Sequence, residues 1–347
     1  MLVRIFSYRN KRQAKKVLIV LAILAALIFS VCLIRFIYLQ RYLVYVGDQV
    51  TLDFEQDLGR EPRPDPPSWA GTPVEIIMEA PVEQEVASTD TPMTKLRGYY
   101  ITMDMLQNVD KVTEEINKLE NPQAILMDLK SIYGNFYYSS GTYGATKANA
   151  DIDAIDRLIE SLAARDHLYL IARIPSLSDN NFALANQSSG LPLRSGALWM
   201  DRHACYWLDP MSTTVQEYLA SIAEELAAMG FDEVVFDQFE IPGSENIVYS
   251  SELSREEAAA EAANALKTML ENTPIRVSFG SSNEQVAAHS DRIYLATNDG
   301  SSVASLVESV KEPMEDPSVQ IVFLTASRDT RFNDYGVLRP VIEGREE

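Results

Sequence analysis

Short runs of apolar residues, each six or seven long, alternate along residues 97–342 with segments in which apolar residues recur every three or four positions. Runs of that length are typical of buried parallel strands, and the periodic segments are typical of helices with one apolar face. Apolar faces of this kind lie within 152–162 and 215–229. We expect strands at 97–102, 124–130, 168–174, 233–238, 275–280, 292–297 and 319–325, and a weaker one at 336–342.

The number of these units predicts the fold class. Seven or eight β/α units in about 250 residues match the size of an α/β protein with a (β/α)8 TIM-type barrel. An open, doubly wound sheet would use the same elements and remains the alternative. The expected helix boundaries include a capping box at Ser254–Glu257 and a stop at Gly230. We place the barrel domain at 95–347.

Residues 17–39 form one apolar run that only Arg35 interrupts. As a helix this run is about 35 Å long, enough to cross a hydrocarbon core of about 30 Å. Residues 1–16 contain six basic residues and no acid, which favours a cytoplasmic N-terminus. We therefore predict a single-pass cell-membrane protein with a basic cytoplasmic tail, a transmembrane anchor at 17–39 and an extracytoplasmic barrel. A cleaved signal peptide is the alternative, but its apolar core would be shorter and would end at small residues.

The segment 40–94 differs in composition from the rest. Residues 55–93 contain seven of the 16 prolines and nine acids against two arginines. Such a mixture buries too little apolar surface to offset the cost of ordering the chain. We expect a disordered extracellular stalk.

The overall charge and the small number of potential metal ligands disfavour nucleic-acid binding and metal binding. The formal net charge of −20 disfavours binding to nucleic acid, because that binding depends on neutralising phosphates. Neutral partners such as a polysaccharide or oligosaccharide fit better. Cys32 lies in the predicted anchor and Cys205 in the barrel, so no intrachain disulfide is expected, and the three histidines lack metal-ligand spacing. We expect no metal and no cofactor.

Alternation along the predicted strands points to candidate catalytic carboxylates. In the second strand Asp128 and Lys130 share the inward parity of Leu126, and in the fourth Asp237 shares that of Val235. The loops after the strands of a barrel form one catalytic face, and a carboxylate is costly to bury there without a task or a partner. Asp237 is the first candidate. A structural ion network of Asp128, Lys130, Asp237 and Arg173 is the alternative.

Further residues near these strand ends could contact a sugar. Aromatic rings can stack on its apolar face, and carboxylates, amides and cations can bind its hydroxyl groups. Asp237, Asp128 and Glu240 are the predicted catalytic set. The predicted substrate-binding set is Lys130, Arg173, Tyr100, Trp207, Gln238, Asn298 and Asp299, and Ser278 is a further residue expected at the rim.

Several of these motifs, in this order, resemble the bacterial putative glycoside hydrolase domain family, whose members are taken to be distant relatives of α-amylase-like barrels. The resemblance covers most of 97–300. It implies that Asp237 occupies the nucleophile position and that Asp128 and Lys130 match the second-strand acid and base. The motifs are Gly98–Thr102, Asp128–Lys130 with Gly134, Ala172–Ile174 with Asp179, Trp207–Pro210, and Gly230–Glu233 leading to Phe236-Asp237.

The chain also departs from this family at functional positions. Glu240 replaces an arginine, Ser278 stands where an aspartate is usual, and the loop 297–300 differs. Two hypotheses therefore stand. The first is a membrane-anchored glycoside hydrolase acting on a cell-envelope or extracellular polysaccharide. The second is a catalytically inactive barrel that binds a glycan or an envelope partner.

Overall fold

The computed structural model describes residues 43–46, 49–52, 93–120, 122–142, 144–249 and 252–342. The chain divides into two compact units, Met1–Met78 and Glu79–Glu347. In the first unit, β1 (Leu43–Val46) and β2 (Gln49–Leu52) form an antiparallel pair. This pair lies in the segment expected to be a stalk without strands, although its aromatic and β-branched residues favour one.

The predicted membrane anchor at 17–39 and the tail before it lie outside the described residues. Within the described part of the chain, no helix has the length and apolar character needed to cross a bilayer.

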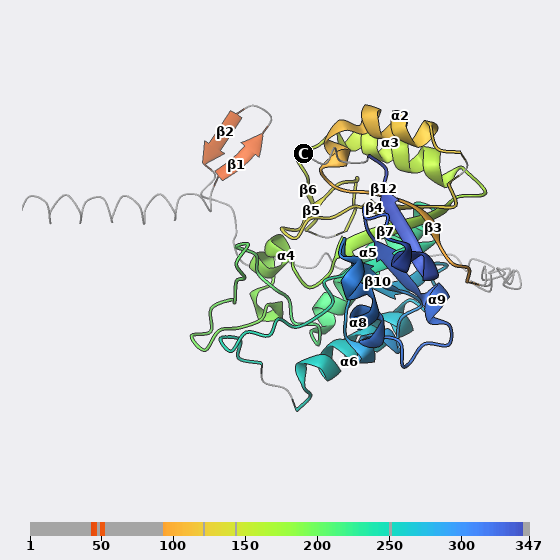
Figure 1. The fold of residues 1–347 in the computed structure, drawn as a ribbon. Coiled ribbons are helices and arrows are strands. Elements are labelled where there is room, and N and C mark those ends of the chain that lie inside the picture. The colour runs from red at the N-terminus through yellow and green to blue at the C-terminus, as the bar shows by residue number, and fades with distance from the viewer. Residues whose placement is uncertain are drawn as a thin grey trace, which may run out of the picture. The chain divides into compact units, whose positions relative to one another are not determined.

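The second unit contains a closed barrel of parallel strands surrounded by helices (Figure 1). The strands pair in chain order, and the last pairs with the first through contacts such as Val337 with Arg97. This closure confirms the predicted barrel and excludes the open sheet. All eight predicted strands are present: β3 (Arg97–Ile101), β4 (Ala124–Asp128), β7 (Tyr169–Pro175), β8 (Glu233–Asp237), β9 (Arg276–Phe279), β10 (Ile293–Ala296), β11 (Ile321–Leu324) and β12 (Gly336–Pro340).

Strand alternation divides the core into two layers. The inner layer fills the barrel and includes Leu126, Ile171, Val235 and Leu338. The outer, larger layer packs the opposite faces of the strands against the helices. Because both faces of each strand are covered, the strands are mostly apolar, and the resulting apolar runs can be recognised in the sequence.

The helices begin and end at the predicted signals. Ser254 and Glu257 form a capping box, and Gly230 follows the preceding helix with φ +91°, a conformation that favours glycine. The α-helices are α2 (Val109–Asn117), α3 (Ile152–Ala163), α4 (Asn180–Ala185), α5 (Thr213–Ala228), α6 (Arg255–Met269), α7 (Glu284–Ala287), α8 (Val303–Glu308) and α9 (Pro317–Gln320). The 3-10 helices are η2 (Met105–Asn108), η3 (Gln187–Ser189), η4 (Gly300–Ser302) and η5 (Thr330–Asp334).

Two of the loops at the carboxyl ends of the strands carry structure of their own. The loop after β4 holds a short parallel pair, β5 (Asn135–Phe136) and β6 (Thr146–Lys147). The segment after β7 holds α4 and η3 and is tied down by isolated bridges such as Ser178 to Trp207. These loops belong to the face where barrel enzymes place their active sites.

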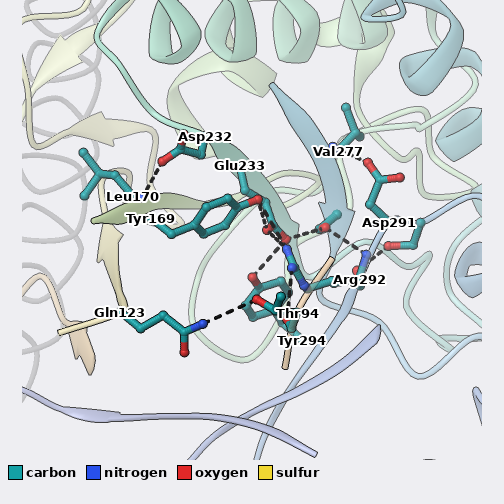
Figure 2. Close-up of polar contacts among 12 residues, drawn as sticks. Thr94, Gln123, Tyr169, Leu170, Asp232, Glu233, Val277, Asp291, Arg292 and Tyr294 are labelled. Atoms are coloured by element: carbon teal, nitrogen blue, oxygen red, sulfur yellow. Dashed lines mark hydrogen bonds and ion pairs between the residues drawn. The ribbon is translucent and has the colours of Figure 1, made fainter. Parts of the chain in front are cut away.

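The amino-terminal end of the barrel, which we call the base, is closed by a buried polar network around Glu233 (Figure 2). The Glu233 carboxylate pairs with Arg292 and accepts hydrogen bonds from Ser278 (2.6 Å), Tyr169 (2.9 Å) and Tyr294 (2.9 Å). The expectation that Ser278 lies at the rim of the opposite end is wrong. Its hydroxyl lies inside the barrel and donates to Glu233.

Candidate active site at the barrel mouth

The carboxyl end of the barrel, which we call the mouth, carries a second charged cluster. Asp128 ends β4 and lies directly opposite Arg173 of β7 in the strand register. The Arg173 guanidinium donates from Nε to Asp128 Oδ1 at 2.7 Å and from Nη2 to Oδ2 at 2.8 Å. This two-point geometry is the strongest form of an arginine–carboxylate pair. Asp128 is therefore held in place by both of its oxygens.

Asp237 ends β8 and faces the other side of the same guanidinium. Its Oδ2 lies 3.6 Å from Arg173 Nη1, too long for a strong hydrogen bond. Its side chain keeps 30% of its surface exposed, against 9% for Asp128. The mouth therefore holds one tightly bound carboxylate and one that is open to a ligand.

Gly280, just after β9, makes room for Asp237. A Cβ atom at position 280 would lie 2.1 Å from Asp237 Oδ1, far inside van der Waals contact. The glycine is required by this close approach. The sequence shows a glycine after a strand but not what it faces.

The shared arginine limits how far apart the two carboxylates can be. Guanidinium nitrogens are about 2.3 Å apart for C–N bonds of about 1.33 Å, so the nearest oxygens of Asp128 and Asp237 lie within about 9 Å. Glycosidases use carboxyl separations of about 5–5.5 Å for retention and about 6.5–9.5 Å for inversion. The upper bound is compatible with either geometry.

Burial and neighbouring charges shift the pKa values of Asp237 and Arg173. Burial raises the pKa of Asp237, although Arg173 and the Gln238 backbone N–H oppose the rise; the charge of Asp128 adds to it. Burial alone would lower the pKa of Arg173, but Asp128 and Asp237 raise it above the ordinary value. The cluster therefore contains a permanent cation, a clamped anion and a carboxyl group with increased proton affinity.

Two of the predicted substrate-binding residues border this cluster. Tyr100 packs on the inner core, and its pKa is raised by burial, with opposing effects from Arg173 and Asp128. Gln238 follows Asp237 with a positive φ of 54°, uncommon for a residue with a side chain, and accepts a hydrogen bond from Ser178 Oγ. Strained backbone of this kind is often found at functional sites.

Lys130 does not meet Asp128 at the rim, contrary to the prediction from alternation. Strand β4 ends at Asp128, and Lys130 is fully buried with its Nζ 2.8 Å from Asp179 Oδ2. Tyr218 of α5 donates to the same Asp179 oxygen at 2.8 Å. Lys130 therefore belongs to a structural ion pair behind the mouth, and Arg173 is the cation that contacts Asp128.

Trp207 is also unsuited to contact a sugar in this conformation. Only 8% of its surface is exposed, and its indole N–H donates to Asp201 at 3.0 Å. Its ring packs edge-on against Trp199, with ring centroids 6.4 Å apart. This residue stabilises the segment after β7.

Three further predicted residues have surroundings different from those of the Asp128–Arg173–Asp237 cluster. Glu240 lines a pocket of about 340 Å³ between the loop after β8 and α6, and Asp237 is not among its lining residues. The Asn298 side chain accepts a hydrogen bond from the backbone of Ala326 at 2.8 Å and so braces two neighbouring loops. Asp299 caps η4, and hydrogen bonds from Ser301 lower its pKa. In this arrangement Asp299 holds the start of η4.

Among the described residues, no group of three or more His, Cys, Asp or Glu side chains is arranged to hold a metal ion.

Comparison with known proteins identifies the family. The family described as "Putative glycosyl hydrolase domain" matches residues 98–309, more than half of the chain. The chain belongs to this family. The match contains the carboxyl ends of β4, β7 and β8 and therefore the whole Asp128–Arg173–Asp237 cluster. A search of curated proteins found no match.

Solved structures share the barrel at low sequence identity. An α-galactosidase from Lactobacillus brevis is 9% identical with a TM-score of 0.50, over 73% of this chain and 38% of its own. An α-galactosidase from Thermus thermophilus is 12% identical with a TM-score of 0.49, over 73% and 59%. A hypothetical protein from Ruminiclostridium thermocellum is 22% identical with a TM-score of 0.45, over 52% and 96%. The match spans less than two thirds of each α-galactosidase, and the likeness concerns the fold alone.

Proposed function

We propose that this chain is a membrane-anchored glycoside hydrolase that acts on a cell-envelope or extracellular polysaccharide through Asp237. The observation that carries the proposal is the cluster at the mouth, where Arg173 holds Asp128 and leaves Asp237 open. A carboxyl group with a raised pKa beside a second carboxylate, on the catalytic face of a barrel, is an arrangement that glycoside hydrolysis can use. Membership of a glycosyl hydrolase domain family supports the same reaction class.

The two acids take different roles in this proposal. Asp237, with its raised pKa and accessible oxygens, donates a proton to the leaving glycosidic oxygen. Asp128, held at both oxygens by Arg173, stabilises the positive charge that develops on the sugar ring or attacks the anomeric carbon. This division reverses the roles that the family resemblance implied for Asp237, because a carboxylate clamped at both oxygens is a poor proton donor.

Substitution of Asp237 provides the test. A panel of envelope and extracellular polysaccharides is first screened for release of reducing ends by the wild-type protein. On any substrate that is cleaved, Asp237→Asn is expected to lower kcat by about 10²–10⁴-fold, the usual contribution of a general acid. The control is Glu160→Gln, which changes an exposed acid on α3 and should leave kcat within about threefold. An unchanged kcat in Asp237→Asn would exclude this role for Asp237.

A non-catalytic relative that binds glycan is the second candidate. Both oxygens of Asp128 are engaged by Arg173, and two other carboxylates in the loops after the strands, Asp179 and Asp329, are paired with Lys130 and Arg331. This arrangement supports binding without turnover. Glycan binding by calorimetry, with no product from any substrate after long incubation, would favour this candidate over the hydrolase.

The membrane location is proposed from the sequence of residues 1–39. External protease added to intact cells is expected to remove the barrel and to leave the N-terminal tail protected. Protection of the barrel until the cells are lysed would contradict the proposed orientation.

A further inference from the structure

A pocket of about 360 Å³ lies on the outside of the barrel, against β3 and β12. In the register of these strands Val337 pairs with Arg97, and Arg339 pairs with Tyr99. The neighbouring residues Leu338 and Tyr100 pack in the inner core of the barrel. The pocket is therefore separated from the mouth by the sheet itself. It is lined by Arg97, Gly98, Tyr99, Glu120, Pro122, Gln123, Asn333, Val337 and Arg339.

The pocket holds two guanidinium groups without a bound acid. Among the described residues, neither Arg97 nor Arg339 forms an ion pair, and Glu120, the only carboxylate in the lining, pairs with neither. Arg97 donates to the carbonyls of Leu96 (3.0 Å), Asn333 (2.7 Å) and Tyr335, and Arg339 donates to that of Ser327. In a chain with 50 acids and 30 basic residues, two neighbouring arginines without a carboxylate partner are unexpected.

The mutual repulsion of these arginines favours an anion between them. Burial lowers the pKa of Arg97, and the charge of Arg339 lowers it further, so the two cations interact. A bound oxyanion would relieve the repulsion and accept charge-assisted hydrogen bonds. Carboxylates and phosphates are the groups that guanidinium pairs bind most strongly.

The remaining lining residues match a sugar better than a bare ion. Tyr99 supplies an aromatic ring, and Asn333 and Gln123 supply amide groups. Figure 2 shows Gln123 fixed at the edge of the base network by its contact with Thr94 (3.4 Å). The volume lies within the range of about 300–1,000 Å³ typical of small-molecule sites, which exceeds the need of one inorganic anion.

We propose that this pocket is a second, non-catalytic saccharide site that binds a sugar carrying a carboxylate, such as a uronic acid unit. Arg97 and Arg339 hold the carboxylate, the Tyr99 ring contacts the apolar face of the sugar, and the amides contact its hydroxyl groups. The site would hold an acidic glycan on the side of the barrel. It does not depend on turnover at the mouth.

Calorimetry with matched trisaccharides tests this site on the full chain. The probes are trigalacturonate and the neutral galactotriose of the same linkage. We expect trigalacturonate to bind at least about tenfold more tightly, and Arg339→Gln to lose about tenfold in that affinity. The matched control is Arg157→Gln, which removes a charge on α3 and should change nothing. Arg339 donates to a loop carbonyl and to no carboxylate, so its replacement should not disturb folding, which circular dichroism checks.

A second variant tests whether the sugar itself, and not only its charge, contacts the pocket. Tyr99→Leu should weaken binding of both trisaccharides, because it removes the ring and leaves the charges. Equal affinity of the wild-type protein for the two probes would overturn the proposal. So would trigalacturonate binding that responds to Asp237→Asn and not to Arg339→Gln, because that pattern places the ligand at the mouth. Binding is measured without turnover, so this result is independent of whether the mouth hydrolyses anything.

Discussion

Strand β8 carries an inward acid at each end, and the two acids have opposite surroundings. Glu233 at the base is fully buried and meets one guanidinium and three hydroxyl groups. Asp237 at the mouth, about 13 Å away along the strand, is partly exposed, and its ion pair with Arg173 is long, at 3.6 Å. A carboxylate whose hydrogen-bonding capacity is filled by the protein stabilises the fold, and one left open can act on a ligand. The predictions below test this difference.

The largest effect on stability is expected from Arg292→Met at the base. It leaves the Glu233 charge buried without its cation, which costs about 3–5 kcal/mol of unfolding free energy. Urea denaturation measures the loss. Arg173→Met at the mouth is the matched variant and should cost less, because the side chains of Asp128 and Asp237 keep 9% and 30% of their surface exposed, whereas Glu233 keeps none. If Arg173→Met were the more damaging of the two, the mouth would be the structural cluster.

A pair of tyrosine variants makes a finer comparison. Tyr294→Phe removes a donor to Glu233 at 2.9 Å and should cost about 1.5–3 kcal/mol, as expected for a hydrogen bond to a charged group. Tyr100→Phe at the mouth should cost no more than about 0.5 kcal/mol. Thermal and urea unfolding of both proteins give the values. Equal losses would contradict the distinction between base and mouth.

Gly280→Ala should disturb the mouth with a moderate loss of stability. The added methyl group would overlap Asp237 Oδ1, so either the loop after β9 or the carboxylate must move, at a cost of about 1–3 kcal/mol. We expect activity, or glycan affinity if the protein is inactive, to fall together with this shift. Gly243→Ala, where a Cβ meets nothing within 4 Å, is the control. Indistinguishable behaviour of the two variants would show that the contact with Asp237 is unimportant.

The smallest expected effect is a pH dependence of stability from Asp237. Its pKa is higher in the folded than in the unfolded protein, so the folded state binds the proton more tightly. Protonation therefore favours folding, and this contribution is lost as pH rises from about 4, the unfolded value, through the folded pKa. Relative to Asp237→Asn, the wild-type protein should lose stability across that interval and not above it. A constant difference between pH 3 and 7 would contradict the raised pKa.

Sequence patterns predicted the barrel well because each strand is a short, mostly apolar run separated from the next by a longer segment. Alternation also identified Asp237 and Asp128, whose parity follows that of Val235 and Leu126. The same rule failed for Lys130, because alternation holds only while the strand lasts and β4 ends two residues earlier. Lys130 instead pairs with Asp179, which lies on the loop after a different strand.

The base network was missed for a related reason. Glu233 has the same inward parity as Asp237, so the rule that found one acid could have found the other. Its partner Arg292 lies 59 residues away, and nothing local in the sequence links them. Gly280 likewise shows its role only when β8 and β9 are placed side by side. Strand alternation predicts which side chains point into the barrel. Which residues they contact depends on how the strands are placed in the closed barrel.

The crystal structure of the Asp237→Asn protein with a bound oligosaccharide tests the central claim most directly. The account predicts that a glycosidic oxygen lies about 3 Å from the substituted amide side chain, with the Asp128–Arg173 pair intact beneath the sugar ring. An oligosaccharide bound elsewhere, with the mouth empty and the substituted side chain without a ligand contact, would contradict it.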